Sequence, residues 1–512
     1  MTDWTAGYVA DIGYTFGYYA ALNPLRLQLA FLNAGLVAPV KANTACELGF
    51  GQGLSVNLHA AASVSQWVGT DFNPAHAGFA QELAAFSGAD ARLFDQSFAE
   101  FCDRSDLPEF DFIGLHGTWS WISDENRAVI VDFVRRKLKV GGVFYISYNT
   151  QPGWATMVPM RDLLTEHGEV MGAAGQGIVS RIEGALGFAD RLFATNPIYV
   201  RANPQVTERL KAIKGENRNY LAHEYFNRDW MPMSFARMAE WLAPAKLNFA
   251  CSANYLDAID AVNLSSEQQV LLKEIPDAMF RETVRDFMVN KQFRMDYWVR
   301  GVRKLHPLEQ IEALRRQRVI LVQHRADVSL KVKGAMGEGT LREDVYRPIL
   351  DALADHQPKT LGQIEQAVKD KGVVFAQVME AALVLGGTGS LYPVQDDAVI
   401  SKARKLTDKI NAFLRDKARS SNDNGVLASP VIGGGMAVGR FQQLFLLAKA
   451  QGKKQADEYA QYVWQVLAAQ GQKIVKDGKT LETPEESLAE LTAQARAFSE
   501  KQLPILKALG IA

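Results

Sequence analysis

The sequence predicts an α/β fold, in which a doubly wound, mainly parallel sheet is followed by mostly helical domains. Short apolar runs recur before residue 150, and helical segments of about 10–15 residues separate them. Strands that alternate with helices in this way pair in parallel through crossover connections. Beyond Gln151 the apolar runs become rare and helical periodicity dominates. The sheet is therefore expected at the start of the chain.

The predicted elements alternate in a simple order. Strands are expected at 44–48, 66–70, 91–94, 110–116 and 142–148, and helices at 54–62, 74–86 and 124–138. The segment Lys139-Val-Gly-Gly142 precedes the last strand. It predicts a turn, because glycine tolerates the positive φ that such a turn needs.

Length and composition exclude several classes of protein. The chain has 512 residues, of which 48% are hydrophobic and 22% charged, so it is not disordered or collagen-like. A net charge of −1 gives no general attraction for nucleic acid or anionic membranes. We expect no membrane insertion and no signal peptide, because neither apolar pattern occurs. Cys46, Cys102 and Cys251 are scattered, so no metal site is expected. We predict a cytoplasmic, multidomain protein.

Shifts of pattern divide the chain into four predicted domains: the sheet domain at 1–200, a middle helical domain at 201–325 with a possible role in dimerisation, a winged-helix-like module at 326–400, and a C-terminal helical domain at 401–512. The module is expected because three short helices at 341–354, 361–369 and 375–385 precede a glycine-rich hairpin. The segment 281–333 is locally basic, which indicates a solvated or interdomain face or a contact with an acidic partner.

The charge of the predicted module argues against nucleic-acid binding. Residues 339–394 contain five lysines and arginines against seven acidic residues, and the helix at 375–385 has no basic residue. Phosphate contacts need lysine or arginine. We therefore expect a module that contacts protein and no nucleic-acid partner.

The most informative motif is Ala45-Cys-Glu47-Leu-Gly49-Phe-Gly51-Gln-Gly53. A strand that ends in glycines and leads into a helix lets a ligand approach the backbone closely. The pattern is not G-x-G-x-x-G, because Leu54 stands at the sixth position. Asp71 ends the second strand, where a carboxylate can accept ribose hydroxyls. A simpler reading makes the glycines a tight turn and Asp71 a helix N-cap, but it leaves Glu47 without a partner in an apolar strand.

These features resemble the class I S-adenosylmethionine (SAM)-dependent methyltransferases. The stretch Glu-x-Gly-x-Gly-x-Gly resembles their motif I, and Phe94-Asp95-Gln96-Ser97 follows the third strand, where the family binds adenine. The resemblance implies a Rossmann-like domain of the seven-stranded type that uses SAM and releases S-adenosylhomocysteine. The cofactor-binding residues that it implies are Glu47, Gly49, Phe50, Gly51, Gly53, Asp71, Asn73, Asp95, Gln96, Ser97 and His116.

The methyl acceptor is expected beyond the carboxyl ends of the fourth and fifth strands. Aromatic residues gather there in the sequence, and aromatic faces attract methylammonium or sulfonium cations by about 0.5–2 kcal/mol each. The candidates for orienting the acceptor are Tyr14, Tyr18, Trp119, Asn149 and Trp154. His116 is a candidate base or cofactor contact. For each aromatic residue the alternative is packing in the core or a lid, which is the expectation for Trp121.

The chain also resembles bacterial methyltransferases with an appended methyltransferase regulatory domain, some of which methylate lysines of outer-membrane proteins. This resemblance includes Tyr18-Tyr-Ala-Ala-Leu-Asn23-Pro, the segment from His223 to Trp230, and Phe249-Ala-Cys-Ser-Ala-Asn-Tyr255. It implies a protein substrate of the outer-membrane type and a homodimer. His223, Glu224 and Tyr225 are further candidates for binding the acceptor, unless they form a helix-packing cluster.

If lysine is the acceptor, its amine must be neutral to attack. A lysine with a pKa of about 10.4 is neutral about once in a thousand at about pH 7.4. An apolar channel beside a sulfonium lowers that pKa by desolvation and repulsion, so no dedicated base is expected. The alternatives are a methyltransferase with a small-molecule acceptor and a non-catalytic regulator that binds SAM or nucleic acid.

Overall fold

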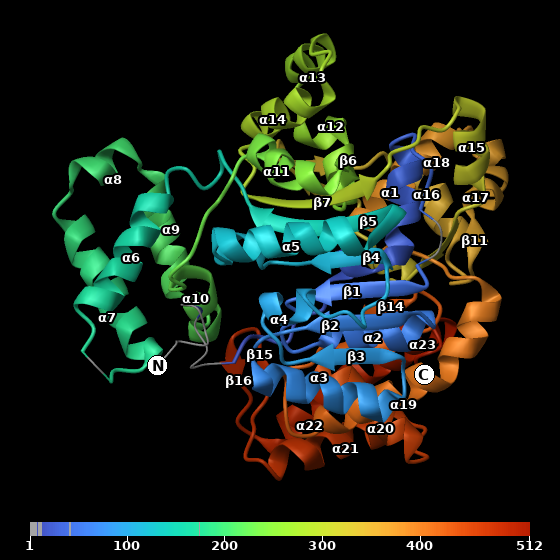
Figure 1. The fold of residues 1–512 in the computed structure, drawn as a ribbon. Coiled ribbons are helices and arrows are strands. Elements are labelled where there is room, and N and C mark those ends of the chain that lie inside the picture. Colours follow the sequence, from blue (N-terminus) through green and yellow to red (C-terminus); the bar gives the residue numbers. More distant parts are fainter. Residues whose placement is uncertain (1–7, 9–12, 40–41, 174) are drawn as a thin grey trace.

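The computed structural model describes residues 8, 13–39, 42–173 and 175–512, and a seven-stranded sheet lies at its centre (Figure 1). Its strands are β1 Thr44–Leu48, β2 Gln66–Thr70, β3 Ala91–Phe94, β4 Phe110–Leu115, β5 Leu138–Asn149, β6 Leu247–Ser252 and β7 Phe293–Arg300. They lie in the order β3-β2-β1-β4-β5-β7-β6. The first five are parallel, and β7 runs antiparallel to both β5 and β6. The doubly wound, mainly parallel sheet that the sequence predicts is confirmed.

Strands β1, β2 and β3 have the predicted bounds, whereas the fourth ends one residue early at Leu115. The fifth begins at Leu138, four residues earlier than expected, because the segment predicted as a turn continues the strand. A shift of register between β4 and β5 next to Phe110 accommodates this extension.

The last two strands correct the expected organisation of the chain. Both β6 and β7 come from 201–325, which the sequence predicts to be a separate helical domain, yet they complete the main sheet. Strand β7 pairs with β5 along Val143–Asn149. Strand β5 lies about 150 residues before β7 in the chain, so local periodicity does not predict that the two strands pair.

Helices cover both faces of the sheet. They are α1 Leu27–Asn33, α2 Leu54–Ser63, α3 Pro74–Ser87, α4 Phe98–Cys102, α5 Asp124–Lys137 and α11 Phe235–Leu242. Successive strand residues face opposite sides: Phe112 packs in the core with α1, α2 and α3, and Ile113 packs in the core with α4, α5 and α11. This alternation is expected of a sheet that is buried on both faces.

A helical lobe is inserted between β5 and β6, and it stands apart from the sheet on the left of Figure 1. It contains α6 Val158–Val170, α7 Ile178–Ala194, α8 Ile198–Ala202, α9 Gln205–Lys214 and α10 Arg218–Tyr225. The lobe has its own apolar core around Leu164, Leu186 and Leu210. The domain boundary that the sequence predicts at residue 200 falls inside this lobe.

The rest of the chain packs against the other side of the molecule. The segment predicted as a winged helix, 326–400, forms a small sheet with the strand just before it, in the order β11-β8-β12. Its elements are β8 Arg318–Leu321, α16 Glu343–Ala352, β11 Lys359–Thr360, α17 Leu361–Val368, α18 Phe375–Gly387 and β12 Leu391–Pro393. Its likeness to a winged helix stays a prediction.

The C-terminal part is mostly helical, as predicted, but it also contains two short hairpins. Its elements are α19 Asp397–Lys417, β13 Val426–Ser429, β14 Gly434–Ala437, α20 Arg440–Ala450, α21 Ala456–Ala468, β15 Val475–Lys476, β16 Lys479–Thr480, α22 Pro484–Ala497 and α23 Leu503–Ala508. Apolar residues of α2 share a core with this region.

The remaining elements connect these units: α12 Asp260–Asn263, α13 Ser266–Glu274, α14 Ala278–Met288, α15 Pro307–Arg315, β9 Lys331–Gly334 and β10 Gly337–Thr340. Within the described residues, no helix combines the length and apolar character that a membrane span requires.

Candidate functional site

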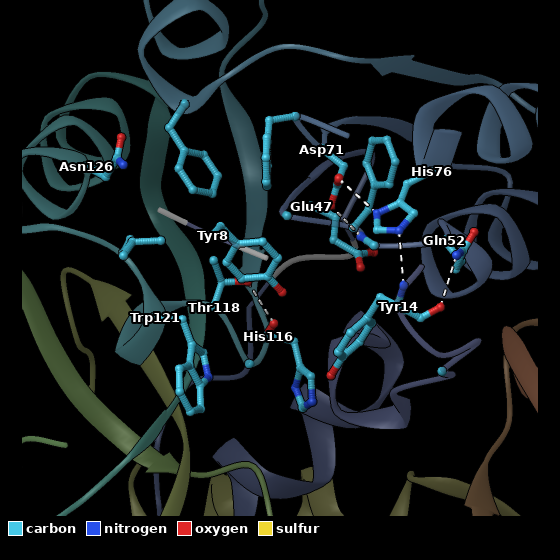
Figure 2. A pocket seen from close by; sticks show the side chains of 18 of the residues that line it. Tyr8, Tyr14, Glu47, Gln52, Asp71, His76, His116, Thr118, Trp121 and Asn126 are labelled. Carbon is cyan, nitrogen blue, oxygen red and sulfur yellow. Dashed lines mark hydrogen bonds and ion pairs between the residues drawn. The ribbon is translucent and has the colours of Figure 1, made fainter. Parts of the chain in front are cut away.

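A pocket lies at the carboxyl ends of β1, β2 and β4, where doubly wound sheets bind ligands (Figure 2). Tyr8 and residues from 14–19, 47–52, 71–76, 96–98, 116–126 and 224–229 line it. It therefore joins the glycine loop after β1 to the end of α10 in the inserted lobe. Of the predicted cofactor residues, Glu47, Gly49, Phe50, Gly51, Asp71, Gln96, Ser97 and His116 line the pocket.

The glycine loop turns sharply between β1 and α2. Gly49, Gly51 and Gly53 all have positive φ, at 70°, 57° and 73°, which other residues rarely adopt. A side chain at Gly53 would collide with Ala80 of α3. Gly53 does not line the pocket, so its contribution is to let α2 pack against α3.

Asp71 organises the loop rather than capping a helix. Its carboxylate accepts hydrogen bonds from the backbone N–H of Gly51 at 2.9 Å and of Asn73 at 3.0 Å, and His76 Nδ1 lies 3.2 Å away. Asn73 caps α3 by accepting from the Ala75 N–H and does not line the pocket. The prediction of Asn73 as a cofactor contact is therefore not supported by its position.

Glu47 is a buried acid at the end of β1. It is 3% exposed, and its Oε2 has no hydrogen-bond partner among the described residues. Burial, with a smaller contribution from Asp71, raises the pKa of Glu47 to about 8. An unpaired buried carboxylate is unfavourable until a cation reaches it. The site thus fits the ammonium group of the methionyl part of SAM.

Two of the three residues predicted to contact adenine, Gln96 and Ser97, line the pocket beside Phe98. Ser97 also forms the capping box of α4 with Glu100. Asp95 is exposed and does not line the pocket, so its role as a cofactor contact stays a prediction.

Aromatic residues cover the opposite wall. Tyr8, Tyr14, Tyr19 and Trp121 line the pocket. The Tyr14 backbone N–H donates to His76 Nε2 at 3.3 Å, and Gln52 Nε2 donates to the Tyr14 carbonyl at 3.0 Å (Figure 2). The segment before α1 is therefore fastened over the glycine loop, as expected for Tyr14.

His116 lines the pocket but is poorly suited to proton transfer. Its ring stacks on Tyr19 with centroids 3.8 Å apart, and its Nδ1 lies 2.7 Å from the Tyr145 hydroxyl. Burial lowers the pKa of His116 to about 3, so the ring is neutral and weakly basic near neutral pH. Its position fits a cofactor contact better than a base.

Four of the residues predicted to orient the acceptor lie outside the pocket. The Tyr18 hydroxyl is 3.1 Å from His59 Nε2, and its ring packs against the β13–β14 hairpin. Trp119 is fully buried, and its Nε1 donates to Met233 Sδ at 3.3 Å. Asn149 is buried at the end of β5, and its backbone N–H donates to Ser120 Oγ.

Trp154, the fourth of these residues, packs in the lobe. Its ring lies edge-on to Trp230, which stacks on Trp121 of the pocket wall with centroids 5.7 Å apart. Trp121 is buried, as expected, and it also lines the pocket. The sequence placed the aromatic residues at the right edge of the sheet, but side-chain direction decided which of them face inward.

Helix α10 brings the three further candidates close to the pocket, and only Glu224 lines it. His223 is buried beneath the rings of Tyr8 and Tyr14, with centroids 5.4 Å and 5.1 Å away. The Tyr225 hydroxyl accepts hydrogen bonds from Arg209. Burial raises the pKa of Glu224 to about 7, although a hydrogen bond from Tyr14 opposes this rise.

Sequence reasoning missed several lining residues: Tyr8, Thr15, Tyr19, Gln52, His76, Asn126 and Asp229. Some lie next to motifs that it used. Tyr19 follows Tyr18 directly, and His76 lies one turn after Asp71 at the start of α3. Asp229 belongs to the same segment as Glu224, but no local pattern indicates that this segment reaches the glycine loop.

Comparisons with known proteins agree with this geometry. Residues 217–300, which include α10, β6 and β7, match a family described as a predicted methyltransferase regulatory domain. The uncharacterized protein sll1526 of Synechocystis sp. is 44% identical over 512 residues, which is 99% of each chain. The uncharacterized protein RP789 of Rickettsia prowazekii is 25% identical over 290 residues, 56% of this chain and 51% of that protein.

The fold also matches solved structures. PKMT2 of Rickettsia typhi in complex with AdoHcy superposes with a TM-score of 0.70 at 17% identity, over 97% of this chain and all of that chain. A second structure of PKMT2 of Rickettsia typhi gives a TM-score of 0.67 at 18% identity, over 98% of this chain and all of that chain. The sheet order, the glycine loop that follows a buried acid, and these likenesses agree. The chain belongs to the same family as sll1526, that of class I SAM-dependent methyltransferases with a methyltransferase regulatory domain.

Proposed function

We propose that this SAM-dependent methyltransferase methylates the side-chain amine of lysine in a protein substrate. The observation that carries the proposal is the charge of the pocket. Four carboxylates line it, those of Glu47, Asp71, Glu224 and Asp229, and the described lining residues include no lysine or arginine. Such a pocket attracts cations, and both the sulfonium donor and a lysine side chain arrive as cations.

The two pairs of acids lie on different walls and suit different ligands. Glu47 and Asp71 follow β1 and β2, and they suit the ammonium and ribose hydroxyls of SAM. When bound, SAM supplies an electrophilic methyl group on sulfur. Glu224 and Asp229 come from the end of α10 and the segment after it. Asp229 lies 3.4 Å from the guanidinium of Arg228, so Glu224 is the acid proposed for a second cation.

The aromatic wall suits a lysine amine better than an arginine guanidinium, which carries more N–H donors. Tyr8, Tyr14, Tyr19 and Trp121 line the pocket and limit its contact with water. Desolvation lowers the pKa of an amine, and the neutral form is the nucleophile. Positioning within this walled space supplies the remaining requirement of an in-line displacement.

Incubation of the protein with radiolabelled SAM and a cell-envelope protein extract tests the proposal. We expect label in discrete protein bands and, after acid hydrolysis, in methylated lysine. The Asp71→Ala variant serves as the control without cofactor binding. Label found only in the small-molecule fraction would instead favour a metabolite acceptor, and label in another amino acid would reject lysine.

A further inference from the structure

We propose that the Glu224 carboxylate accepts the proton of the acceptor's ammonium group and so generates the neutral amine that attacks the methyl group. This inference rests on the proposed lysine acceptor, and it replaces the expectation that no dedicated base is needed. It starts from the position of Glu224, which lies at the end of α10 and lines the same pocket as the glycine loop.

The other carboxylates of the pocket are already engaged or assigned. Asp71 holds two backbone N–H groups and His76. Asp229 lies 3.4 Å from the guanidinium of Arg228 at the exposed end of the wall. Glu47 sits beneath the loop, where the cofactor's ammonium is expected. Glu224 is therefore the carboxylate on the acceptor's wall of the pocket that has no other assigned function.

The surroundings of Glu224 make it a base rather than a permanent counter-ion. Among the described residues, the phenols of Tyr8, Tyr14, Tyr19, Tyr220 and Tyr225 interact with it. The neighbouring His223 packs against the rings of Tyr8 and Tyr14. Burial raises the pKa of each phenol, so they stay neutral near pH 7 and do not compete for the proton. The pKa of Glu224 itself, about 7, is close to the operating pH that suits general base catalysis.

Tyr14 holds the carboxylate in place. Its hydroxyl interacts with both Glu224 and Tyr19, and its backbone is tied to His76 and Gln52. The hydrogen bond from Tyr14 favours the charged form of the Glu224 carboxyl group. Tyr14 is thus a positioning residue, and it couples the base to the glycine loop.

The proposed step balances in atoms and charge. An N–H bond of the lysine ammonium breaks, the proton moves to a Glu224 oxygen, and the electron pair stays on nitrogen. That lone pair then forms the N–CH₃ bond while the S–CH₃ bond breaks, and its electrons remain on sulfur. A carboxylate, an ammonium and a sulfonium become a carboxylic acid, a methylammonium and a thioether, so the net charge stays +1.

The test uses an amine-bearing analogue of SAM, so it does not depend on the identity of the acceptor protein. In sinefungin an amine-bearing carbon replaces the methylated sulfur, which puts an ammonium beside the transfer position. We expect the wild-type protein to prefer sinefungin over S-adenosylhomocysteine increasingly as the pH rises from about 6 to about 8.5. Isothermal calorimetry measures both dissociation constants across this range.

Glu224→Gln should reduce the preference for sinefungin over S-adenosylhomocysteine about tenfold. It should also abolish the pH dependence of that preference. Its affinity for S-adenosylhomocysteine should change less than about twofold, which also reports that the variant is folded. Asp229→Asn is the matched pocket control and should lose less of the preference, because Asp229 already lies 3.4 Å from the guanidinium of Arg228. Glu208→Gln, on the exposed face of α9, is the remote control.

Retention of the preference by Glu224→Gln would overturn the inference while leaving the proposed function intact. Failure of the wild-type protein to bind S-adenosylhomocysteine would instead reject the cofactor site. With a protein acceptor in hand, kcat/KM should rise with pH through about 7 in the wild type, and this limb should be absent from Glu224→Gln.

Discussion

The two walls of the pocket are built in different ways. The glycine-loop wall comes from β1, β2 and the turns that follow them, all within residues 44–76. The opposite wall combines the segment before α1, the turn after β4 and the end of α10, which are up to about 200 residues apart. The glycine-loop wall is a local motif, whereas the opposite wall is completed by residues at the end of the inserted lobe. The cofactor wall should therefore tolerate changes in the lobe, and the acceptor wall should not.

The largest effect on this comparison is expected from Asp71→Ala. The change removes the acceptor of the Gly51 and Asn73 N–H groups together with the carboxylate that suits the ribose. We expect binding of S-adenosylhomocysteine to weaken by about 100-fold, as measured by calorimetry. Asp95→Ala, an exposed change outside the pocket, is the control and should leave binding nearly unchanged.

The neighbouring residues Trp119 and Trp121 separate packing from acceptor binding. Trp119 is fully buried in the core, so Trp119→Ala should lower the free energy of unfolding by about 3–5 kcal/mol. Trp121 is also buried, at 6% exposed, so Trp121→Ala should lower the free energy of unfolding as well. Because Trp121 lines the pocket and Trp119 does not, only Trp121→Ala should in addition lower the turnover of the folded enzyme, by about threefold to tenfold, with little change in cofactor affinity. Urea denaturation measures the stability of both variants, and methylation kinetics of the folded proteins measure turnover. The same loss of turnover in both folded variants would contradict the assigned positions.

Glu47→Gln tests whether the buried acid of the cofactor wall makes the stability of the protein depend on pH. The pKa of Glu47 is raised from its ordinary value near 4.5 to about 8, so the folded state binds more protons than the unfolded state in this window. The free energy of unfolding therefore falls as the pH rises through it. Glu47→Gln should flatten that fall and weaken binding of S-adenosylhomocysteine by about tenfold.

Thermal denaturation of the ligand-free protein between about pH 5 and about pH 9 measures the slope. Added S-adenosylhomocysteine should stabilise the wild type more than Glu47→Gln at the upper end. An unchanged slope in the variant would mean that Glu47 is not the group responsible.

The smallest effect is expected from His116→Asn. Since His116 is neutral and weakly basic, its replacement should lower turnover by less than about threefold and leave the shape of the pH–rate profile unchanged. Loss of one limb of the pH–rate profile in His116→Asn would instead indicate that His116 acts as a base. The measurement is kcat/KM across the pH range with the same acceptor for both proteins.

Much of the cofactor wall could be predicted from the sequence because its determinants are local. Glu47, Gly49, Gly51 and Asp71 lie at the ends of strands whose bounds the apolar pattern already indicated. Two residues predicted for this wall, Asn73 and Asp95, do not line the pocket, and both lie in turns after strands. Periodicity does not determine which residues of a turn face the pocket.

The acceptor wall was predicted less well. The aromatic residues lay at the correct edge of the sheet, but Tyr18, Trp119 and Trp154 point away from the pocket, whereas Tyr19 and Trp121 point into it. Neighbouring residues differ in this way because a shift of one position turns a side chain through a large angle. Packing partners on other elements select among these directions.

The sequence by itself determined the doubly wound sheet, the glycine loop and the acids at the ends of β1 and β2, because alternating apolar runs and glycine spacing act over a few residues. Only the tertiary structure decided that β6 and β7 complete the sheet and that Glu224 and Asp229 face the loop. Those relations depend on contacts between segments separated by roughly 100 to 200 residues, and no local pattern encodes them.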